Sequence, residues 1–203
     1  MAKPLTRAEI ERAVRLSGDR RSDYDLNPEI AGRLNGARAL RPAAVLCPIV
    51  ERAGGLHVIL TQRPESMREH AGQVAFPGGK IDPDDPTPEA AALREAEEEI
   101  GLSPALAQII GRIDPYETGT GFRVDPIVAM IDPGFVAAPD PREVADAFET
   151  PLDFLMDRAN LETHERVWQG INRRFYAYSW EGRYIWGATA GMLKSLADRV
   201  AAA

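Results

Sequence analysis

The sequence predicts an α/β fold in which a mixed β-sheet is packed between helices. Strand-like apolar runs alternate along the chain with helical patterns, as expected for a layered α/β domain. Two of these runs, residues 43–51 and 56–62, are almost continuously apolar, which is typical of strands covered on both faces. The length of 203 residues suits one domain with extra elements at its ends, and no linker divides it.

The N-terminal part of the chain is predicted to contain one helix, a polar loop and a β-hairpin. Helical spacing of apolar residues predicts a helix over residues 6–16. The polar stretch 22–40 is predicted as a loop with a short helix at 30–34. Residues 43–51 and 56–62 flank a Gly-Gly turn, which predicts that they pair as a hairpin. Residues 63–86, rich in glycine and proline, are predicted as a loop.

The best-defined element of the sequence is a helix over residues 88–100. Thr87 is a suitable N-cap, Pro88 suits the first helical position, and Gly101 provides the stop. The remaining predicted elements are strands at 107–113, 124–131 and 145–149, a helix at 151–157, hairpin strands at 174–180 and 183–185, and a helix at 188–202.

Composition and charge indicate an ordinary soluble protein. Charged residues make up 27% of the chain and the net charge is −7, which disfavours broad binding to nucleic acid. Residues 1–20 contain no signal-peptide pattern, and no apolar stretch reaches the length of a membrane span. We therefore expect a cytoplasmic protein without a membrane or nucleic-acid partner. The single cysteine, Cys47, lies in an apolar run and is interpreted as a buried, inert thiol.

Three glutamates on the predicted helix are candidates for a metal site. Glu95, Glu98 and Glu99 are spaced i, i+3 and i+4, so they should share one exposed face. Their mutual repulsion could be offset by a hard divalent cation, which prefers carboxylate oxygens, or simply by water around an acidic surface. A glycine loop, Phe76-Pro77-Gly78-Gly79-Lys80, precedes the helix and could bring the Gly79 carbonyl to the same ion.

These residues resemble the Nudix box, G-x5-E-x7-R-E-U-x-E-E-x-G-U, where U is apolar. The matching positions are Gly79, Arg94, Glu95, Ala96, Glu98, Glu99, Gly101 and Leu102. Two departures precede the helix. Asp85 replaces the first glutamate, and eight residues rather than seven separate it from Arg94, which leaves the role of Asp85 open.

A second motif resembles the coenzyme A diphosphatase subgroup of this family. That subgroup carries L-T-x-R-S-x3-R-x3-G-x3-F-P-G-G directly before the box. The chain has Leu60-Thr61-Gln62-Arg63-Pro64, then Arg68, Gly72 and Phe76-Pro77-Gly78-Gly79, with every spacing matched and Pro64 in place of serine. The resemblance covers about residues 42–196. It therefore implies a Nudix hydrolase domain over 41–203 and an N-terminal helical extension over 1–40.

The resemblance implies a Nudix-type α/β/α sandwich and hydrolysis of the diphosphate of coenzyme A to adenosine 3′,5′-bisphosphate and 4′-phosphopantetheine. It implies Mg²⁺ or Mn²⁺ held by Glu95, Glu99, Glu98 and the Gly79 carbonyl. The catalytic candidates are Glu98, Arg94 and Glu143. The candidates for substrate binding are Arg63, Arg68, Gly72 and Phe76. Arg94 is expected to orient the glutamates through a bidentate ion pair. The expected partner is a small nucleotide, and the oligomeric state is left open between a monomer and a homodimer.

Several alternatives remain open at this point. The chain could hydrolyse another nucleotide, such as ADP-ribose, a nucleotide sugar or a nucleoside triphosphate, or it could bind a nucleotide without turning it over. The general base is either a box glutamate or Glu143, which could equally be an exposed loop acid. The three histidines lack metal-ligand spacing, although His70 lies inside the upstream motif. The three tryptophans are interpreted as core residues.

Overall fold

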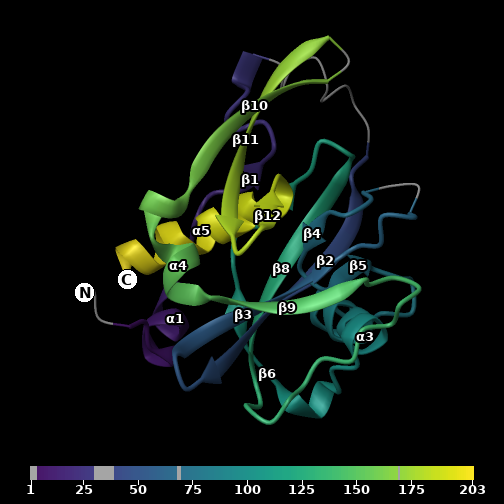
Figure 1. The fold of residues 1–203 in the computed structure, drawn as a ribbon, viewed down its shortest axis with the longest axis vertical. Helices are drawn as coiled ribbons and strands as arrows, with labels where there is room; N and C mark the ends of the chain where they lie inside the picture. The colour runs from purple at the N-terminus through teal and green to yellow at the C-terminus, as the bar shows by residue number, and fades with distance from the viewer. Residues whose placement is uncertain (1–3, 30–38, 68–69, 169) are drawn as a thin grey trace.

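The computed structural model describes residues 4–29, 39–67, 70–168 and 170–203. Within these residues, nine strands form one mixed sheet and three more form a separate antiparallel sheet (Figure 1). The short helix predicted at 30–34 lies outside the described residues. In the part of the chain that the structure describes, no helix is both long enough and apolar enough to cross a membrane.

The centre of the large sheet is β2 (Arg41–Arg52), which pairs in parallel with β8 (Phe122–Ile131) and antiparallel with β3 (Gly55–Gln62). The predicted β2–β3 hairpin is therefore confirmed. The other strands of this sheet are β1 (Arg21–Ser22), β4 (Val74–Ala75), β5 (Gly78–Lys80), β6 (Ala107–Arg112), β7 (Tyr116–Glu117) and β9 (Asp146–Pro151). The strands β1 and β7 were not predicted, and the predicted loop 63–86 contains β4 and β5.

Residues of the central strand alternate between two apolar clusters, one on each face of the sheet. Cys47 and Ile49 pack with α1 (Arg7–Ala13), α4 (Leu152–Met156) and α5 (Ala188–Ala202). Leu46 and Val50 point to the other face and pack against α3 (Pro88–Ile100). Helices thus cover both faces, which confirms the predicted sandwich. Cys47 is fully buried, as predicted, and burial raises the pKa of its thiol to about 12.

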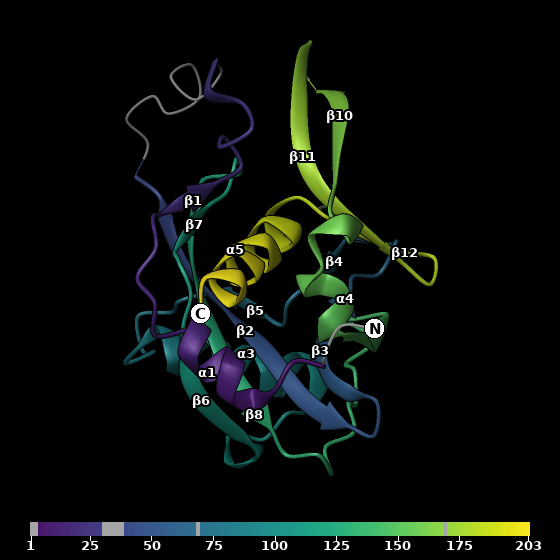
Figure 2. The ribbon, with the colours of Figure 1, turned by 90° about the vertical axis from the view of Figure 1, so that its left-hand side faces the viewer.

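The smaller sheet consists of β10 (Glu162–Trp168), β11 (Ile171–Trp180) and β12 (Arg183–Trp186). Strands β10 and β11 project beyond the main sheet as an arm (Figure 2). The β11–β12 hairpin was predicted, although β11 starts three residues earlier. β10 was not predicted, because its residues are mostly polar and exposed and show no apolar alternation. Short 3₁₀ helices, η1 (Pro104–Leu106) and η2 (Arg158–Asn160), join other elements.

The predicted helix at 6–16 is shorter in the structure and ends at Ala13. It packs on α5 through Ile10, which is fully buried. Farther along the N-terminal segment, β1 pairs with β7 in the main sheet. The segment before residue 40 is thus in direct contact with the sandwich where the structure describes it. The predicted boundary between an extension and a domain near residue 40 stays a prediction.

One edge of the main sheet gathers the elements that carry the site. Strands β2 and β8 both begin there, and the antiparallel strand β3 ends there. The short strand β5 pairs with the first residues of β2, while β4 pairs with the last residues of β3. The Thr189 hydroxyl, at the start of α5, donates to the Val74 carbonyl at 3.2 Å. The segment 73–80 therefore lies between α5 on one side and α3 on the other.

Candidate active site

The orientation of α3 is fixed at both ends and along its buried side. The Thr87 side chain accepts a hydrogen bond from the Ala90 N–H at 3.2 Å, as predicted for an N-cap. Gly101 ends the helix with φ 69°, a left-handed conformation that favours glycine. Ala96 and Ile100 are fully buried against the sheet. This packing directs the box glutamates toward β5 and solvent.

Glu99 is the most unusual carboxylate of the helix. It was expected on an exposed face, but only 4% of it is exposed because β5 lies over it. Its Oε2 accepts a hydrogen bond from the Gly78 N–H at 3.3 Å. Burial raises the pKa of Glu99 to about 8, and the charges of Glu95 and Glu143 add to this effect, while Gly78 and Arg63 oppose it. The protein thus keeps a carboxyl group where ionisation is costly.

Glu95 lies against the same strand, one helical turn from Glu99. A Cβ atom at position 79 would stand 2.5 Å from its Oε1, so a side chain there would displace the Glu95 carboxylate. Burial raises the pKa of Glu95, and a 3.0 Å contact with Nη1 of Arg94 opposes that rise. Glu98, by contrast, has a side chain that is 56% exposed, and it lies 3.5 Å from the same Arg94 nitrogen.

Arg94 makes its bidentate ion pair with Asp85 rather than with the glutamates. Its Nε donates to Oδ1 of Asp85 at 3.1 Å and its Nη2 donates to Oδ2 at 2.9 Å. Nη2 also donates at 3.2 Å to the carbonyl of Lys80, the last residue of β5. Asp85 raises the pKa of Arg94 further, and Arg94 lowers the pKa of Asp85. The expected orienting role of Arg94 therefore depends on an acid whose function the sequence left open.

The donor set around β5 is suited to a cation. Within the described residues, no group of three or more histidine, cysteine, aspartate or glutamate side chains is placed to hold a metal ion. Two carboxylates, Glu95 and Glu99, nevertheless flank Gly78 and Gly79, and burial raises both their pKa values. Buried carboxylates with raised pKa values are stabilised as anions by a nearby cation. The chemistry of these oxygen ligands fits a hard divalent ion.

Two further predicted residues, on other elements, carry charges that affect the glutamates. Arg63 follows β3; it is half-buried, and its charge lowers the pKa of Glu99. Its Nε is buried and has no hydrogen-bond partner among the described residues. Glu143 lies in an exposed turn before β9, and its charge raises the pKa values of both Glu95 and Glu99. The structure thus brings Arg63 and Glu143 toward the same carboxylates.

The other predicted residues are placed differently. Phe76 is 3% exposed and packs in the core, so its side chain anchors the turn before β5. Gly72 has φ 66°, and a Cβ there would meet the Glu65 carboxylate at 2.3 Å, so it shapes the loop between β3 and β4. Arg68 lies outside the described residues. Asp85 is the residue whose function the sequence analysis missed. Its position at the first acid of the box was the available signal.

Comparison with known proteins places this site in a family. The NUDIX domain model matches residues 40–176. The Nudix hydrolase NudL of Yersinia pestis is 39% identical over 160 residues, which cover 79% of this chain and 80% of the relative. NudL of Yersinia pseudotuberculosis shows the same identity and coverage. The chain belongs to the Nudix hydrolase family.

Solved structures give a more distant comparison. A Caenorhabditis elegans Ap4A hydrolase is 21% identical, with 55% of this chain and 80% of that chain covered and a TM-score of 0.48. The Nudix hydrolase RenU of Mycobacterium smegmatis is 26% identical, with 61% and 79% covered and a TM-score of 0.46.

Family membership defines the general activity. The protein is an enzyme that hydrolyses the diphosphate bond of a nucleoside diphosphate derivative. Enzymes of this family generally use divalent metal ions such as Mg²⁺ or Mn²⁺.

Proposed function

We propose that this Nudix hydrolase cleaves the diphosphate of coenzyme A or of its acyl derivatives. The products are adenosine 3′,5′-bisphosphate and 4′-phosphopantetheine or its acyl form. The main support is the upstream motif at residues 60–79, which resembles coenzyme A diphosphatases at every spacing. In the fold, this segment leads from the end of β3 to the glycine strand that covers Glu99. The motif therefore adjoins the carboxylates of the candidate active site.

Arg63 is the motif residue best suited to bind the diphosphate. The protein carries a net charge of −7, so a polyanionic substrate needs local positive charge. The charge of the Arg63 guanidinium lowers the pKa of Glu99. The buried Nε–H of Arg63 has no hydrogen-bond acceptor among the described residues. A phosphate oxygen is a strong acceptor for such a donor. We assign Arg63 to substrate binding, together with Arg68 from the same motif.

The proposed ligands of the divalent ion are Glu95, Glu99, Glu98 and the Gly79 carbonyl. When bound, Mg²⁺ or Mn²⁺ would offset the charge of the diphosphate and lower the pKa of a water molecule. Asp85 holds Arg94, and Arg94 in turn holds the Glu95 carboxylate beside β5. Glu143 is proposed to accept a proton from the attacking water, with Glu98 as the alternative base. Glu143 lies in an exposed turn, and its charge raises the pKa of Glu99.

A hydrolysis screen with product identification tests this proposal. Purified full-length protein is incubated with coenzyme A, an acyl-coenzyme A, ADP-ribose and a nucleotide sugar, each with Mg²⁺ and with Mn²⁺. We expect coenzyme A or its acyl form to give the highest kcat/KM and to release adenosine 3′,5′-bisphosphate. A clear preference for ADP-ribose or a nucleotide sugar would replace the proposal with the broader alternative. Binding without turnover of any compound would support a non-catalytic role.

The Arg63→Ala variant tests the role of the upstream motif. Loss of a phosphate contact should raise KM for coenzyme A about tenfold, in line with the free energy of a hydrogen bond to a charged group. The Mn²⁺ concentration for half-maximal activity should change less than KM, because Arg63 acts on Glu99 only through its charge and is not a proposed metal ligand. An unaltered KM would remove Arg63 from the substrate site.

A further inference from the structure

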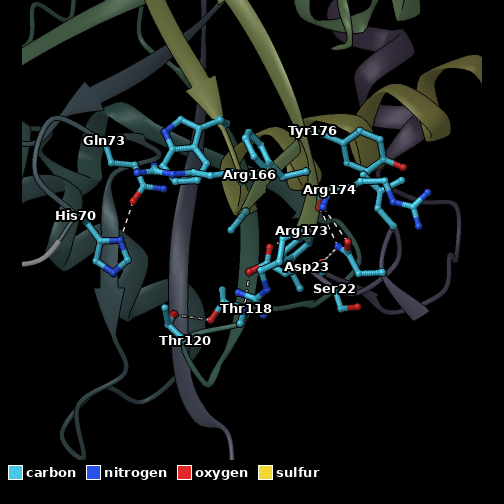
Figure 3. A pocket seen from close by; sticks show the side chains of 18 residues that line it. Ser22, Asp23, His70, Gln73, Thr118, Thr120, Arg166, Arg173, Arg174 and Tyr176 are labelled. Carbon is cyan, nitrogen blue, oxygen red and sulfur yellow. Dashed lines mark hydrogen bonds between the residues drawn. The ribbon is translucent and has the colours of Figure 1, made fainter. Parts of the chain in front are cut away.

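A cavity of about 460 Å³ lies at the same edge of the main sheet and does not include the box glutamates in its lining. Its walls are formed by parts of residues 22–27, 70–73, 116–120, 166–176 and 186–188 (Figure 3). Its volume falls within the range of small-molecule sites, about 300–1,000 Å³. The upstream-motif loop contributes His70 and Gln73 to the wall.

One face of the small sheet supplies aromatic rings and two arginines to this cavity. Strand register places His164 opposite Phe175 and Arg166 opposite Arg173, so all four side chains share a face. The Phe175 and Trp186 rings lie 5.3 Å apart, and both residues line the cavity. Trp186, interpreted from the sequence as a core residue, is half-buried at this wall. Planar rings next to guanidinium groups suit a base that carries a phosphate.

The charge balance of the cavity favours an anion. Two arginines directly opposite each other in a sheet repel one another. Asp23 lies near Arg173 and offsets part of its charge, while it accepts hydrogen bonds from the Tyr116 hydroxyl at 2.9 Å and the Gly119 N–H at 2.7 Å. Arg166 is exposed and forms no ion pair with any residue that the structure describes. The positive charge of Arg166 therefore remains at this wall of an acidic protein.

The cavity lies within reach of the candidate active site. The Gln73 carbonyl accepts a hydrogen bond from the Arg63 N–H at 3.0 Å, and the charge of Arg63 lowers the pKa of Glu99. Gln73 and Gly78 are five positions apart, so their Cα atoms are separated by at most about 18 Å. Gly78 itself donates to Glu99. An extended nucleotide substrate can therefore span from the cavity to the carboxylates.

We infer that this cavity binds the phosphorylated nucleoside half of the substrate, with the base against Phe175 and Trp186 and the ribose phosphate against Arg166 and Arg173. This inference rests on the proposed function, since it assigns the adenosine 3′,5′-bisphosphate half of coenzyme A to the cavity. The pantetheine half is uncharged and would leave Arg166 without an anion. It therefore extends away from the cavity.

Calorimetric binding without metal tests the cavity independently of turnover. Adenosine 3′,5′-bisphosphate and adenosine 5′-monophosphate are titrated into full-length protein in the presence of a chelator. We expect the bisphosphate to bind about tenfold more tightly, because it adds one phosphate contact to arginine. Arg166→Gln combined with Arg173→Gln should abolish this preference, and Arg166→Lys should retain part of it. The control is Arg158→Gln, an exposed arginine that pairs with Asp198 away from the cavity.

Steady-state kinetics then separate failure of the cavity from failure of the proposed function. For the double variant, KM for coenzyme A should rise about tenfold, while KM for dephospho-coenzyme A and both kcat values stay unchanged. An unchanged preference for the bisphosphate in the double variant would overturn the inference, even if coenzyme A is hydrolysed. Loss of that preference in a protein that does not hydrolyse coenzyme A would support the cavity and reject only the substrate proposed above.

Discussion

The glutamate helix and the cavity beside the small sheet share one edge of the molecule, but the chain builds them in different ways. The carboxylate site is assembled mainly from one continuous stretch, residues 78–99, in which helical spacing sets the geometry. The cavity combines segments from residue 22 to residue 188 and depends on strand register and on docking of the N-terminal segment. Local sequence therefore determines the first site, and tertiary packing determines the second.

The two regions also carry opposite charge. At α3, the buried Glu99 and the half-buried Glu95 have raised pKa values and lie against β5. At the small sheet, arginines line an aromatic wall. A substrate with a metal-bound diphosphate at one end and a ribose phosphate at the other would complement both regions. Variants that affect one region and spare the other therefore test whether the two act as separate parts of one substrate site.

The largest expected effect is that of Glu99→Gln. The amide keeps the shape of the side chain but removes a proposed metal ligand, so kcat should fall about 1,000-fold, or about 4 kcal/mol. Folding should be preserved, because the substitution removes a carboxyl group whose ionisation burial opposes. The measurement is kcat with saturating substrate and metal, alongside a thermal unfolding curve.

The matched control for this variant is Glu97→Gln on the same helix. Glu97 is exposed and lies away from β5, so its loss should leave kcat within about twofold, as for a solvated surface charge. Affinity for adenosine 3′,5′-bisphosphate should be unchanged in both variants. Equal activity of the two variants would mean that Glu99 plays no part in catalysis.

Metal removal should have the next-largest effect, and it should depend on pH. An ion at about 100 times its Kd should add about 2.7 kcal/mol and raise Tm by about 5 to 10 °C. The pKa of Glu99 is raised to about 8 in the folded protein from 4.5, so the folded state retains a proton that the unfolded chain releases. The free energy of unfolding of the metal-free protein therefore falls as pH rises from 4.5 to about 8.

The ion competes with that proton, so the gain in Tm from Mg²⁺ or Mn²⁺ should grow between pH 6 and pH 8. Differential scanning calorimetry with metal and with chelator at both pH values measures this difference. A metal-induced shift that is equal at both pH values would show that the ion does not bind the ionised form of Glu99.

Much of the first region could be predicted from the sequence because its determinants are local. The N-cap Thr87, the Gly101 stop and the i, i+3 and i+4 spacing define the helix and the direction of its glutamates. Burial of Glu99 could not be predicted, because it depends on β5 folding over the helix by pairing with β2. The pairing of Arg94 with Asp85 could not be predicted either, because it also depends on tertiary contacts.

The second region gave almost no signal in the sequence. β10 has a mostly polar sequence without apolar alternation, so neither the strand nor the pairing of Arg166 with Arg173 could be predicted. The loop residue Asn27 also looked unremarkable, yet it is 1% exposed and joins the N-terminal segment to β11. Contacts over such long sequence separations cannot be derived from local periodicity.

Asn27→Ala tests the docking that forms the cavity. The side chain accepts from the Arg174 N–H at 2.8 Å and donates to the Arg174 carbonyl at 2.8 Å, and both backbone groups would lose their partner. We expect the free energy of unfolding to fall by about 2 kcal/mol, and affinity for adenosine 3′,5′-bisphosphate to fall with it. Urea denaturation and calorimetry measure the two effects.

The control for this variant is Asn172→Ala on the same strand, where the exposed side chain donates to Glu165 and, among the described residues, forms no other hydrogen bond, so stability should hardly change. The metal-induced gain in Tm should be the same in Asn27→Ala and in the wild-type protein, since α3 is not involved. If Asn27→Ala lowered that gain as much as it lowered nucleotide affinity, the two regions would not be separable.

The smallest expected effect comes from Asp85→Asn, which tests the positioning of Arg94. The amide keeps the size of the carboxylate but replaces a charged bidentate pair with a weaker contact. Arg94 touches Glu95 rather than the proposed substrate residues, so kcat should fall about tenfold while KM changes little. The Mn²⁺ concentration for half-maximal activity should rise, because the orientation of Glu95 is less fixed.

Asp85→Glu provides the decisive comparison, since the family pattern usually has glutamate at this position. Restored activity in Asp85→Glu, together with no effect of Asp84→Asn at the exposed neighbouring acid, would assign the role to the pairing of a carboxylate with Arg94. A rise in KM without any change in the Mn²⁺ concentration for half-maximal activity would instead place Asp85 in contact with substrate. Eight residues rather than seven separate Asp85 from Arg94, so this result also decides whether the longer loop preserves the function of the box acid.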